Sequence, residues 1–216
     1  MKKDKIYLVN HGFELESFTH PDQSLIKAMK ARYNVDDRCP VIGVISRFTE
    51  WKGIQYIIPA FEKLLRNYPN AFLILANANG DYSQQLNSQL KVLPSNSYLT
   101  ICFEKDISIL YQLFNIFVHT PIDAEAEAFG QTYVEALAAG VPSVFTLSGI
   151  AREFIEHEKN AVVVPFKNSD SIFEGISRLL EDEKLRNSLK SEGGKVVESR
   201  FKVEVMMNAL YKMYES

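Results

Sequence analysis

VIGVISRFTEWKGIQYIIPAFEKLLRNYPNAFLILAN, residues 41–77, places an amphipathic segment between two short apolar runs. The runs at 41–46 and 71–77 are apolar almost throughout, which indicates strands buried on both faces of a parallel sheet. Between these runs, apolar residues recur at helical spacing, at Ile54, Ile57, Ile58, Phe61, Leu64 and Leu65. This order of strand, helix and strand is typical of an α/β fold.

The same alternation continues through the rest of the chain. Four more strand candidates follow, at 98–103, 116–120, 142–146 and 161–165. Helices are expected at 22–33, 54–67, 106–114, 131–139, 169–181, 183–199 and 202–214. The sequence therefore predicts an α/β fold with a doubly wound, Rossmann-like parallel sheet of about six strands and helices on both faces. Such sheets bind ligands at the carboxyl ends of their strands, where we expect the functional residues.

Two of the expected helices carry signals for where they begin or end. Asp106 is expected to cap the helix that starts beside it. Gly140, with Pro142 just beyond it, is expected to end the helix at 131–139.

The composition is that of one globular domain. The chain has 216 residues, of which 46% are hydrophobic and 24% charged, and its formal net charge is −3. A chain of this length can bury a full core. Without a general basic field, nucleic acid is not an expected partner, and any anion site must be local. No apolar run approaches the about 20 residues of a membrane span. We therefore expect a soluble, cytoplasmic protein.

Cysteine and histidine are sparse. Cys39 and Cys102 each lie beside apolar residues, which predicts buried free thiols in a reducing compartment. The four histidines show no metal-ligand spacing, so no bound metal is expected. His119 ends a strand candidate and is expected to be a hydrogen-bonded core residue.

Two cations follow the first strand candidate, in RFTEWKG (47–53). Arg47 and Lys52 thus lie at a junction of strand, loop and helix, on the expected ligand edge of the sheet. Lys52 stands at the start of the next helix, where free N–H groups and the helix dipole favour an anion. The pair could clamp a diphosphate and stabilise it as it leaves. The alternative is a solvated loop with two ordinary surface cations.

Two glutamates flank the start of a later helix, in EAFGQTYVE (127–135). Gly130 lets the backbone approach a ligand closely, and the helix start offers free N–H groups. Glu135 suits a ribose, because a carboxylate accepts hydrogen bonds from two vicinal hydroxyls. Glu127 could bond sugar hydroxyls or stabilise positive charge at the anomeric carbon. The alternative is a solvated acidic loop followed by a surface helix residue.

Three other features have competing interpretations. The turn at Ser148–Gly149 could touch phosphate or sugar. Arg152 is expected instead to pair with Glu156, four residues on. The aromatic residues of 48–56 are expected to pack in the core or anchor the loop rather than stack on a base.

Taken together, SRFTEWKG (46–53) and EAFGQTYVEALAAGVPSV (127–144) resemble the donor-binding domain of family 4 retaining glycosyltransferases of the GT-B type. The resemblance covers roughly residues 8–216, and the motifs occur in the family's order. It implies one half of a GT-B fold. It departs from the family at Ser46, where a glycine is frequent, and at FEK (103–105), where the family often has a glycine.

The resemblance also implies residue roles. Arg47 and Lys52 match the pair that binds the donor diphosphate, Glu135 the ribose-binding glutamate, and Glu127 the catalytic residue facing the donor sugar. The backbone of Phe129, Gly130, Gln131 and Thr132 matches the stretch beside sugar and phosphate. The implied activity is transfer of a hexose, with retention of configuration, from a nucleotide sugar to a saccharide or lipid acceptor. No metal or other cofactor is implied.

The resemblance divides the chain into an interdomain linker and leading helix (1–37), a nucleotide-sugar-binding domain (38–200) and a C-terminal crossover helix (201–216). The family's acceptor domain normally precedes NHGFELESF (10–18), so a separate acceptor-binding domain or chain is an expected partner. Membrane association is expected only as a peripheral contact made through such a partner. One alternative is a non-catalytic or split-enzyme binding module. The other is a sugar-nucleotide epimerase, which EAFGQTYVE fits poorly.

Overall fold

The computed structural model describes residues 8–215 and contains a six-stranded, all-parallel sheet in the order β3-β2-β1-β4-β5-β6. The strands are β1 (Val41–Ile45), β2 (Phe72–Ala76), β3 (Tyr98–Ile101), β4 (Ile116–His119), β5 (Ser143–Phe145) and β6 (Val162–Val163). All six coincide with predicted runs, and the doubly wound fold is confirmed. β1 pairs with both β2 and β4, so the strand order reverses beside β1, and this reversal is the switch point of the sheet.

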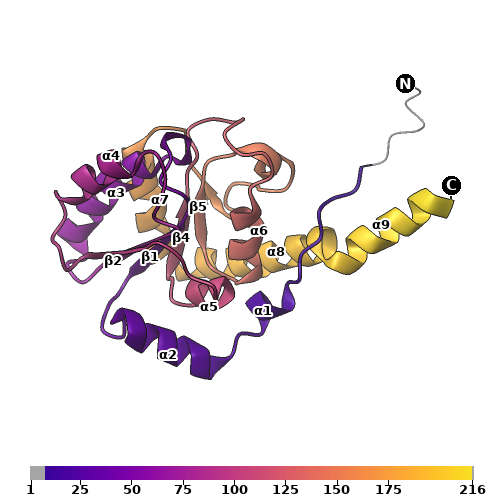
Figure 1. Cartoon of the computed structure of the whole chain (residues 1–216), viewed down its shortest axis with the longest axis horizontal. Helices are drawn as coiled ribbons and strands as arrows, with labels where there is room; N and C mark the ends of the chain where they lie inside the picture. Colours follow the sequence, from indigo (N-terminus) through magenta and orange to yellow (C-terminus); the bar gives the residue numbers. More distant parts are fainter. Residues whose placement is uncertain (1–7, 216) are drawn as a thin grey trace.

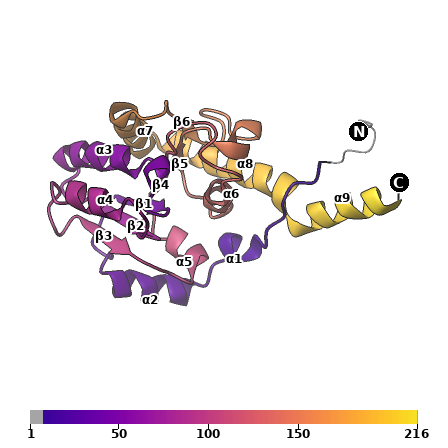
Figure 2. The same cartoon turned by 45° about the horizontal axis from the view of Figure 1, so that its top comes forward.

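The helices form a layer on each face of the sheet (Figures 1 and 2). They are α1 (Glu16–Thr19), α2 (Gln23–Tyr33), α3 (Ile54–Asn67), α4 (Ser83–Leu90), α5 (Ile107–Tyr111), α6 (Gln131–Ala138), α7 (Ser169–Glu181), α8 (Glu183–Phe201) and α9 (Val203–Glu215), with 3-10 turns η2 (Glu50–Lys52) and η3 (Gly149–Glu153). One face packs against α3, α4 and α7, and the other against α5 and α6, with α1, α2 and α8 outside them. Every residue of β1 and β2 is buried, which explains their unbroken apolar sequence.

The short helices α1 and α4 were not predicted, and one expected helix cap is corrected. α4 was not predicted, because SQQLNSQL carries only two apolar residues, Leu86 and Leu90, both buried. Asp106 precedes α5, but its side chain makes no capping hydrogen bond. Its backbone N–H instead donates to Glu104, a buried carboxylate of the FEK stretch, at 3.0 Å. Gly140 does lie just past α6, with a φ of 65°.

Two expectations about side chains are also wrong. Cys39 and Cys102 are free thiols but exposed, because they lie just before β1 and just after β3, outside the covered part of the sheet. Arg152 pairs with Glu125 at 3.1 Å and not with Glu156. The turn η3 ends before residue 156, so the four-residue helical spacing that would join the two does not exist.

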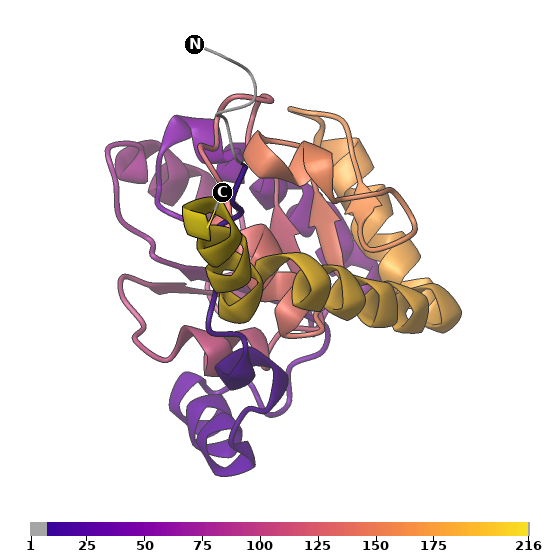
Figure 3. The same cartoon turned by 90° about the vertical axis from the view of Figure 1, so that its right-hand side faces the viewer.

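The N-terminal segment of the described chain lies against the junction of α8 and α9 (Figure 3). Phe13 N–H donates to the carbonyl of Phe201 at 2.7 Å, and Gly12 N–H lies 3.2 Å from the Met206 sulfur. Lys202 has extended backbone angles, which separate the two helices. α9 then projects beyond the sheet and has no buried residue (Figure 1). Within residues 8–215, no helix has the length and apolarity needed to cross a membrane.

Candidate functional site

A hollow of about 250 Å³ lies at the carboxyl ends of β1, β2 and β4, beside the switch point. Its lining includes the predicted residues Arg47, Lys52, Glu127, Gly130, Gln131 and Thr132, together with Asn77 and His119. Arg47 is exposed, and within residues 8–215 its guanidinium makes no ion pair. The fold thus brings cations and a carboxylate from distant parts of the chain to one concave place, where α/β sheets bind ligands.

Glu127 is the centre of a nearly buried charged network. Its Oε1 accepts from Lys52 Nζ at 2.5 Å and lies 2.9 Å from His119 Nε2. The Lys52 side chain is 15% exposed and that of Glu127 is 10% exposed. Glu127 Oε2 has no hydrogen-bond partner among the described residues. One carboxylate oxygen is therefore held by the protein, and the other remains able to accept a ligand hydroxyl.

Lys52 reaches Glu127 because of the turn that carries it. Gly53 follows η2 and precedes α3, and its φ of 74° starts α3 in a new direction. A side-chain carbon at Gly53 would lie 1.9 Å from the carbonyl oxygen of Thr120, just after β4. Only glycine allows this approach, which places Lys52 against the loop that follows β4.

The electrostatics of the network fix its protonation. Burial works to raise the pKa of Glu127, but the hydrogen bonds and charges of His119 and Lys52 outweigh it and lower that pKa to about 2. Burial lowers the pKa of His119 despite the neighbouring carboxylate. At neutral pH the carboxylate is therefore ionised, and neutral His119 donates to it through Nε2. The buried His119 Nδ1 has no partner within the described chain.

The backbone of Glu127 is fixed by the turn after β5. Glu127 N–H donates to Ser148 Oγ at 2.9 Å. A side-chain carbon at Gly149, whose φ is 56°, would lie 2.9 Å from the Glu127 carbonyl oxygen. Ser148 is fully buried, so its hydroxyl supports Glu127 and does not itself face the hollow.

Glu135 and Phe129 lie beside the hollow and not on its lining. Gln131 Nε2 donates to Glu135 Oε1 at 2.7 Å, which connects Glu135 to the hollow through a lining residue. The Phe129 ring packs against Phe13, with ring centres 5.6 Å apart, and against Phe201. The Phe129 ring is therefore part of an aromatic cluster with Phe13 and Phe201, and its backbone carbonyl accepts from the N–H of Ile150 at 3.3 Å.

Three residues at the site, Asn77, His119 and Tyr111, were not expected to belong to it. His119 is hydrogen-bonded and buried as expected, yet its partner is Glu127. Tyr111 Oη donates to Glu135 Oε2 at 3.1 Å, although nothing in the sequence singles it out. Tyr111 lies in α5, whose other apolar residues also pack in the core. Its position in the sequence is therefore the one expected of an ordinary core residue.

Acidification is expected to destabilise the folded chain through Glu127. Its pKa is about 2 when folded against a usual 4.5. The ionised carboxylate therefore contributes stability above pH 4.5, about 3 kcal/mol, which is lost as pH falls from 4.5 to 2. Denaturant unfolding at several pH values should show that acidification lowers the free energy of unfolding less for Glu127→Gln than for the wild type. The surface variant Glu62→Gln should follow the wild type, and parallel curves for all three would contradict the assignment.

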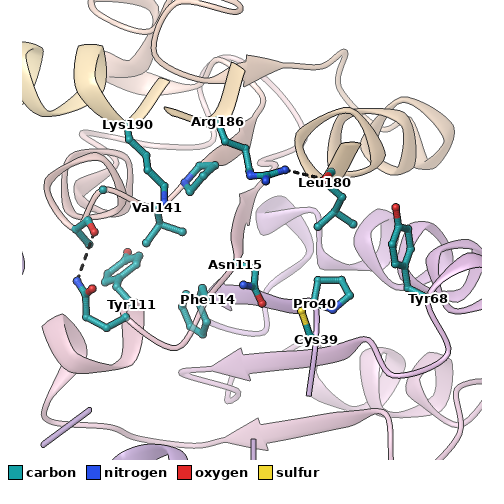
Figure 4. Close-up of a pocket in the computed structure, with 14 residues that line it drawn as sticks. Cys39, Pro40, Tyr68, Tyr111, Phe114, Asn115, Val141, Leu180, Arg186 and Lys190 are labelled. Atoms are coloured by element: carbon teal, nitrogen blue, oxygen red, sulfur yellow. Dashed lines mark hydrogen bonds between the residues drawn. The ribbon is translucent and has the colours of Figure 1, made fainter. Parts of the chain in front are cut away.

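A larger hollow, of about 480 Å³, lies at the opposite, amino-terminal edge of the sheet (Figure 4). Cys39, Phe114, Asn115 and Val141 line it, and Arg186 borders it. The Arg186 guanidinium already donates to the carbonyls of Leu179 and Leu180, so it caps α7. Except for Tyr111, which contributes to its wall, this hollow shares no residue with the site just described, and it lies on the edge where such sheets do not usually bind ligands.

Comparison with known proteins identifies the family. A family model described as glycosyl transferases group 1 matches residues 26–196. An uncharacterized glycosyltransferase of Methanocaldococcus jannaschii is 32% identical over 219 residues, covering 99% of this chain and 54% of that protein. The capsular polysaccharide biosynthesis glycosyltransferase CapM of Staphylococcus aureus is 26% identical over 220 residues, covering 100% of this chain and 56% of CapM. The crystal structure of Anabaena HepE with UDP and glucose aligns with a TM-score of 0.85 at 25% identity, over 96% of this chain and 56% of HepE.

The parallel sheet, its helical layers and these neighbours define a Rossmann-like half of the GT-B type. The chain belongs to the glycosyl transferases group 1 family. It spans about half the length of the curated relatives it matches.

Proposed function

We propose that this chain is the donor-binding half of a family 4 retaining glycosyltransferase and binds a nucleoside-diphosphate sugar. The observation that carries the proposal is the convergence of Arg47, Lys52 and Glu127 on one hollow at the switch point. Cations suit a diphosphate, and a carboxylate with a free oxygen suits a sugar hydroxyl. The similarity to HepE, whose structure contains UDP and glucose, supports the same ligand class.

In this proposal each side chain has a defined task. Lys52 and Arg47 bind the diphosphate and stabilise the charge that it gains on leaving. Glu127 faces the sugar, and Glu135 binds the ribose hydroxyls. The acceptor oxygen bonds to the anomeric carbon on the face from which the diphosphate leaves. The bond between that carbon and the phosphate oxygen breaks, and the acceptor proton passes to the leaving phosphate.

We further propose that no metal takes part, since Lys52 and Arg47 supply the positive charge that a cation would otherwise provide. Within residues 8–215, no group of three or more His, Cys, Asp or Glu side chains could hold a metal ion.

The acceptor and the partner domain belong to the same proposal. We propose a saccharide or lipid acceptor, and a role in polysaccharide biosynthesis like that in CapM's name. Residues 1–37 would serve as linker and leading helix, 38–200 as the donor domain and 201–216 as the crossover helix to a separate acceptor-binding domain or chain. Val205 and Tyr211 of α9 are exposed and available for that contact. The proposed location is the cytoplasm, with any membrane contact made through the partner.

Titration calorimetry tests donor binding directly. The wild-type chain is titrated with UDP-glucose, GDP-mannose, UDP and GDP, each with and without EDTA. We expect saturable binding of at least one nucleoside diphosphate or its sugar, unchanged by the chelator because the cationic site is made of side chains. Absence of binding for all four would overturn the proposed function, and loss of binding in EDTA would overturn its metal-free form.

A further inference from the structure

The Tyr111 hydroxyl is buried in the core but directed at a residue of the proposed site. Tyr111 ends α5 and is fully buried, with its ring packed against those of Phe18, Phe114 and Phe117. Its hydroxyl lies 3.1 Å from Glu135 Oε2 and 3.4 Å from the carbonyl of Thr132. A buried hydroxyl requires a partner, and here the shorter of its contacts is a carboxylate.

The two oxygens of Glu135 are held by donors of different kinds. Oε1 accepts from Gln131, an exposed side chain one turn earlier in α6. Oε2 accepts from Tyr111, whose ring is fixed by the core. Gln131 belongs to the same helix as Glu135, whereas Tyr111 belongs to α5 and its ring is packed in the core. Without Tyr111, the orientation of the carboxylate would rest on the exposed Gln131 amide alone.

We propose that Tyr111 is a positioning residue that holds the Glu135 carboxylate in the orientation that binds the donor ribose, and so sets a preference for ribonucleotides over deoxyribonucleotides. The inference rests on the proposed function, in which Glu135 binds the ribose. Tyr111 itself touches no substrate and acts only through Glu135.

The charges around the pair agree with this role. Burial, followed by the charge and hydrogen bond of Glu135, raises the pKa of Tyr111 well above 10, so its hydroxyl stays a donor. Burial raises the pKa of Glu135, while the hydrogen bonds from Gln131 and Tyr111 oppose the rise. Among the described residues no charged group of α1, α8 or β4 contributes to this balance. Loss of the Tyr111 hydroxyl should therefore raise the pKa of Glu135 further.

Tyr111→Phe tests the inference, because phenylalanine keeps the packed ring and removes only the hydroxyl. Calorimetry with UDP, GDP and their 2′-deoxy analogues should show ribonucleotide affinity about tenfold lower in the variant, with deoxynucleotide affinity reduced less. The pH below which ribonucleotide affinity declines should move upward, because the carboxylate is neutralised earlier. Tyr68→Phe, which removes a hydroxyl at the opposite sheet edge, should leave both readouts unchanged.

A double-mutant cycle separates positioning from general damage to the fold. In a Glu135→Gln background, Tyr111→Phe should have little further effect on affinity, because the carboxylate it positions is absent. An equal loss in both backgrounds, or wild-type affinity and pH dependence in Tyr111→Phe, would overturn the inference. Failure of the wild type to bind any nucleotide would instead overturn the proposed function.

Discussion

Lys52→Ala is expected to weaken the binding of a nucleoside diphosphate by about 100-fold, because it removes a largely buried charge from the proposed anion site. The Lys52 ammonium carries three donors, and Glu127 Oε1 occupies one of them at 2.5 Å. The others remain able to bond phosphate oxygens in the hollow. The variant also leaves the Glu127 carboxylate with His119 alone, so its charge is less well compensated.

Calorimetry with UDP and GDP measures this effect against a matched lysine. Lys63→Ala removes a cation of α3 whose side chain is 41% exposed and pairs with Asp170 on α7, away from the hollow. It should bind nucleotides as the wild type does. Lys52→Arg, which keeps the charge, should retain more affinity than Lys52→Ala. Equal affinities for Lys52→Ala and Lys63→Ala would exclude Lys52 from the anion site.

Gly53→Ala is expected to destabilise the fold by about 4 kcal/mol, from a strained positive φ together with a backbone collision. The added carbon would lie 1.9 Å from the Thr120 carbonyl oxygen, a backbone atom, so no side-chain rotation can relieve the collision. For a chain of this length the melting temperature should fall by about 10 °C. Because Gly53 follows Lys52, the displaced turn should also weaken nucleotide binding.

Two other glycines provide controls for the same substitution. Gly140 also has a positive φ, 65°, but open space around it, so Gly140→Ala isolates the conformational cost, about 1 kcal/mol. Gly194 lies within α8 with open space and no positive φ, so alanine there should be neutral or stabilising by up to about 1 kcal/mol. Thermal unfolding should rank the variants Gly194→Ala, Gly140→Ala, Gly53→Ala in falling stability. A melting temperature for Gly53→Ala equal to that of Gly140→Ala would show that the collision with the Thr120 carbonyl is relieved at little cost in free energy.

Most of the fold could be predicted from local patterns of apolar and polar residues in the sequence. Six apolar runs marked the strands. In β1, β2, β4 and β5 every residue is buried, since a strand covered on both faces has no polar side to interrupt the run, whereas the edge strand β3 is only partly buried. α4 was not predicted because its two buried leucines are too few to give a recognisable helical spacing. The same reasoning wrongly predicted that the thiols of Cys39 and Cys102 are buried. Apolar neighbours in the sequence do not guarantee burial for a residue just outside a strand.

The candidate site was less predictable than the fold. The motifs around Lys52 and Glu127 indicated which residues to examine, and the structure brings both to one hollow, 2.5 Å apart at Nζ and Oε1. The roles of these residues in donor binding remain predictions. His119 and Tyr111 support the two glutamates from the core, where their sequence context is that of ordinary packing. Ser148 lies in a turn for which the sequence suggested a phosphate or sugar contact, but its buried hydroxyl holds the Glu127 backbone.

By itself, the sequence determined the class of sheet, the positions of its strands and the loops that could carry chemistry, because burial on both faces and chain turns leave local signatures. Tertiary structure alone decided which oxygen of Glu127 stays free, that Tyr111 holds Glu135, and how closely Gly53 approaches Thr120. Apart from the contact of His119 with Glu127, eight positions on, those contacts join residues at least 24 positions apart. Their geometry depends on how the sheet and helices pack, which no local pattern of side chains specifies.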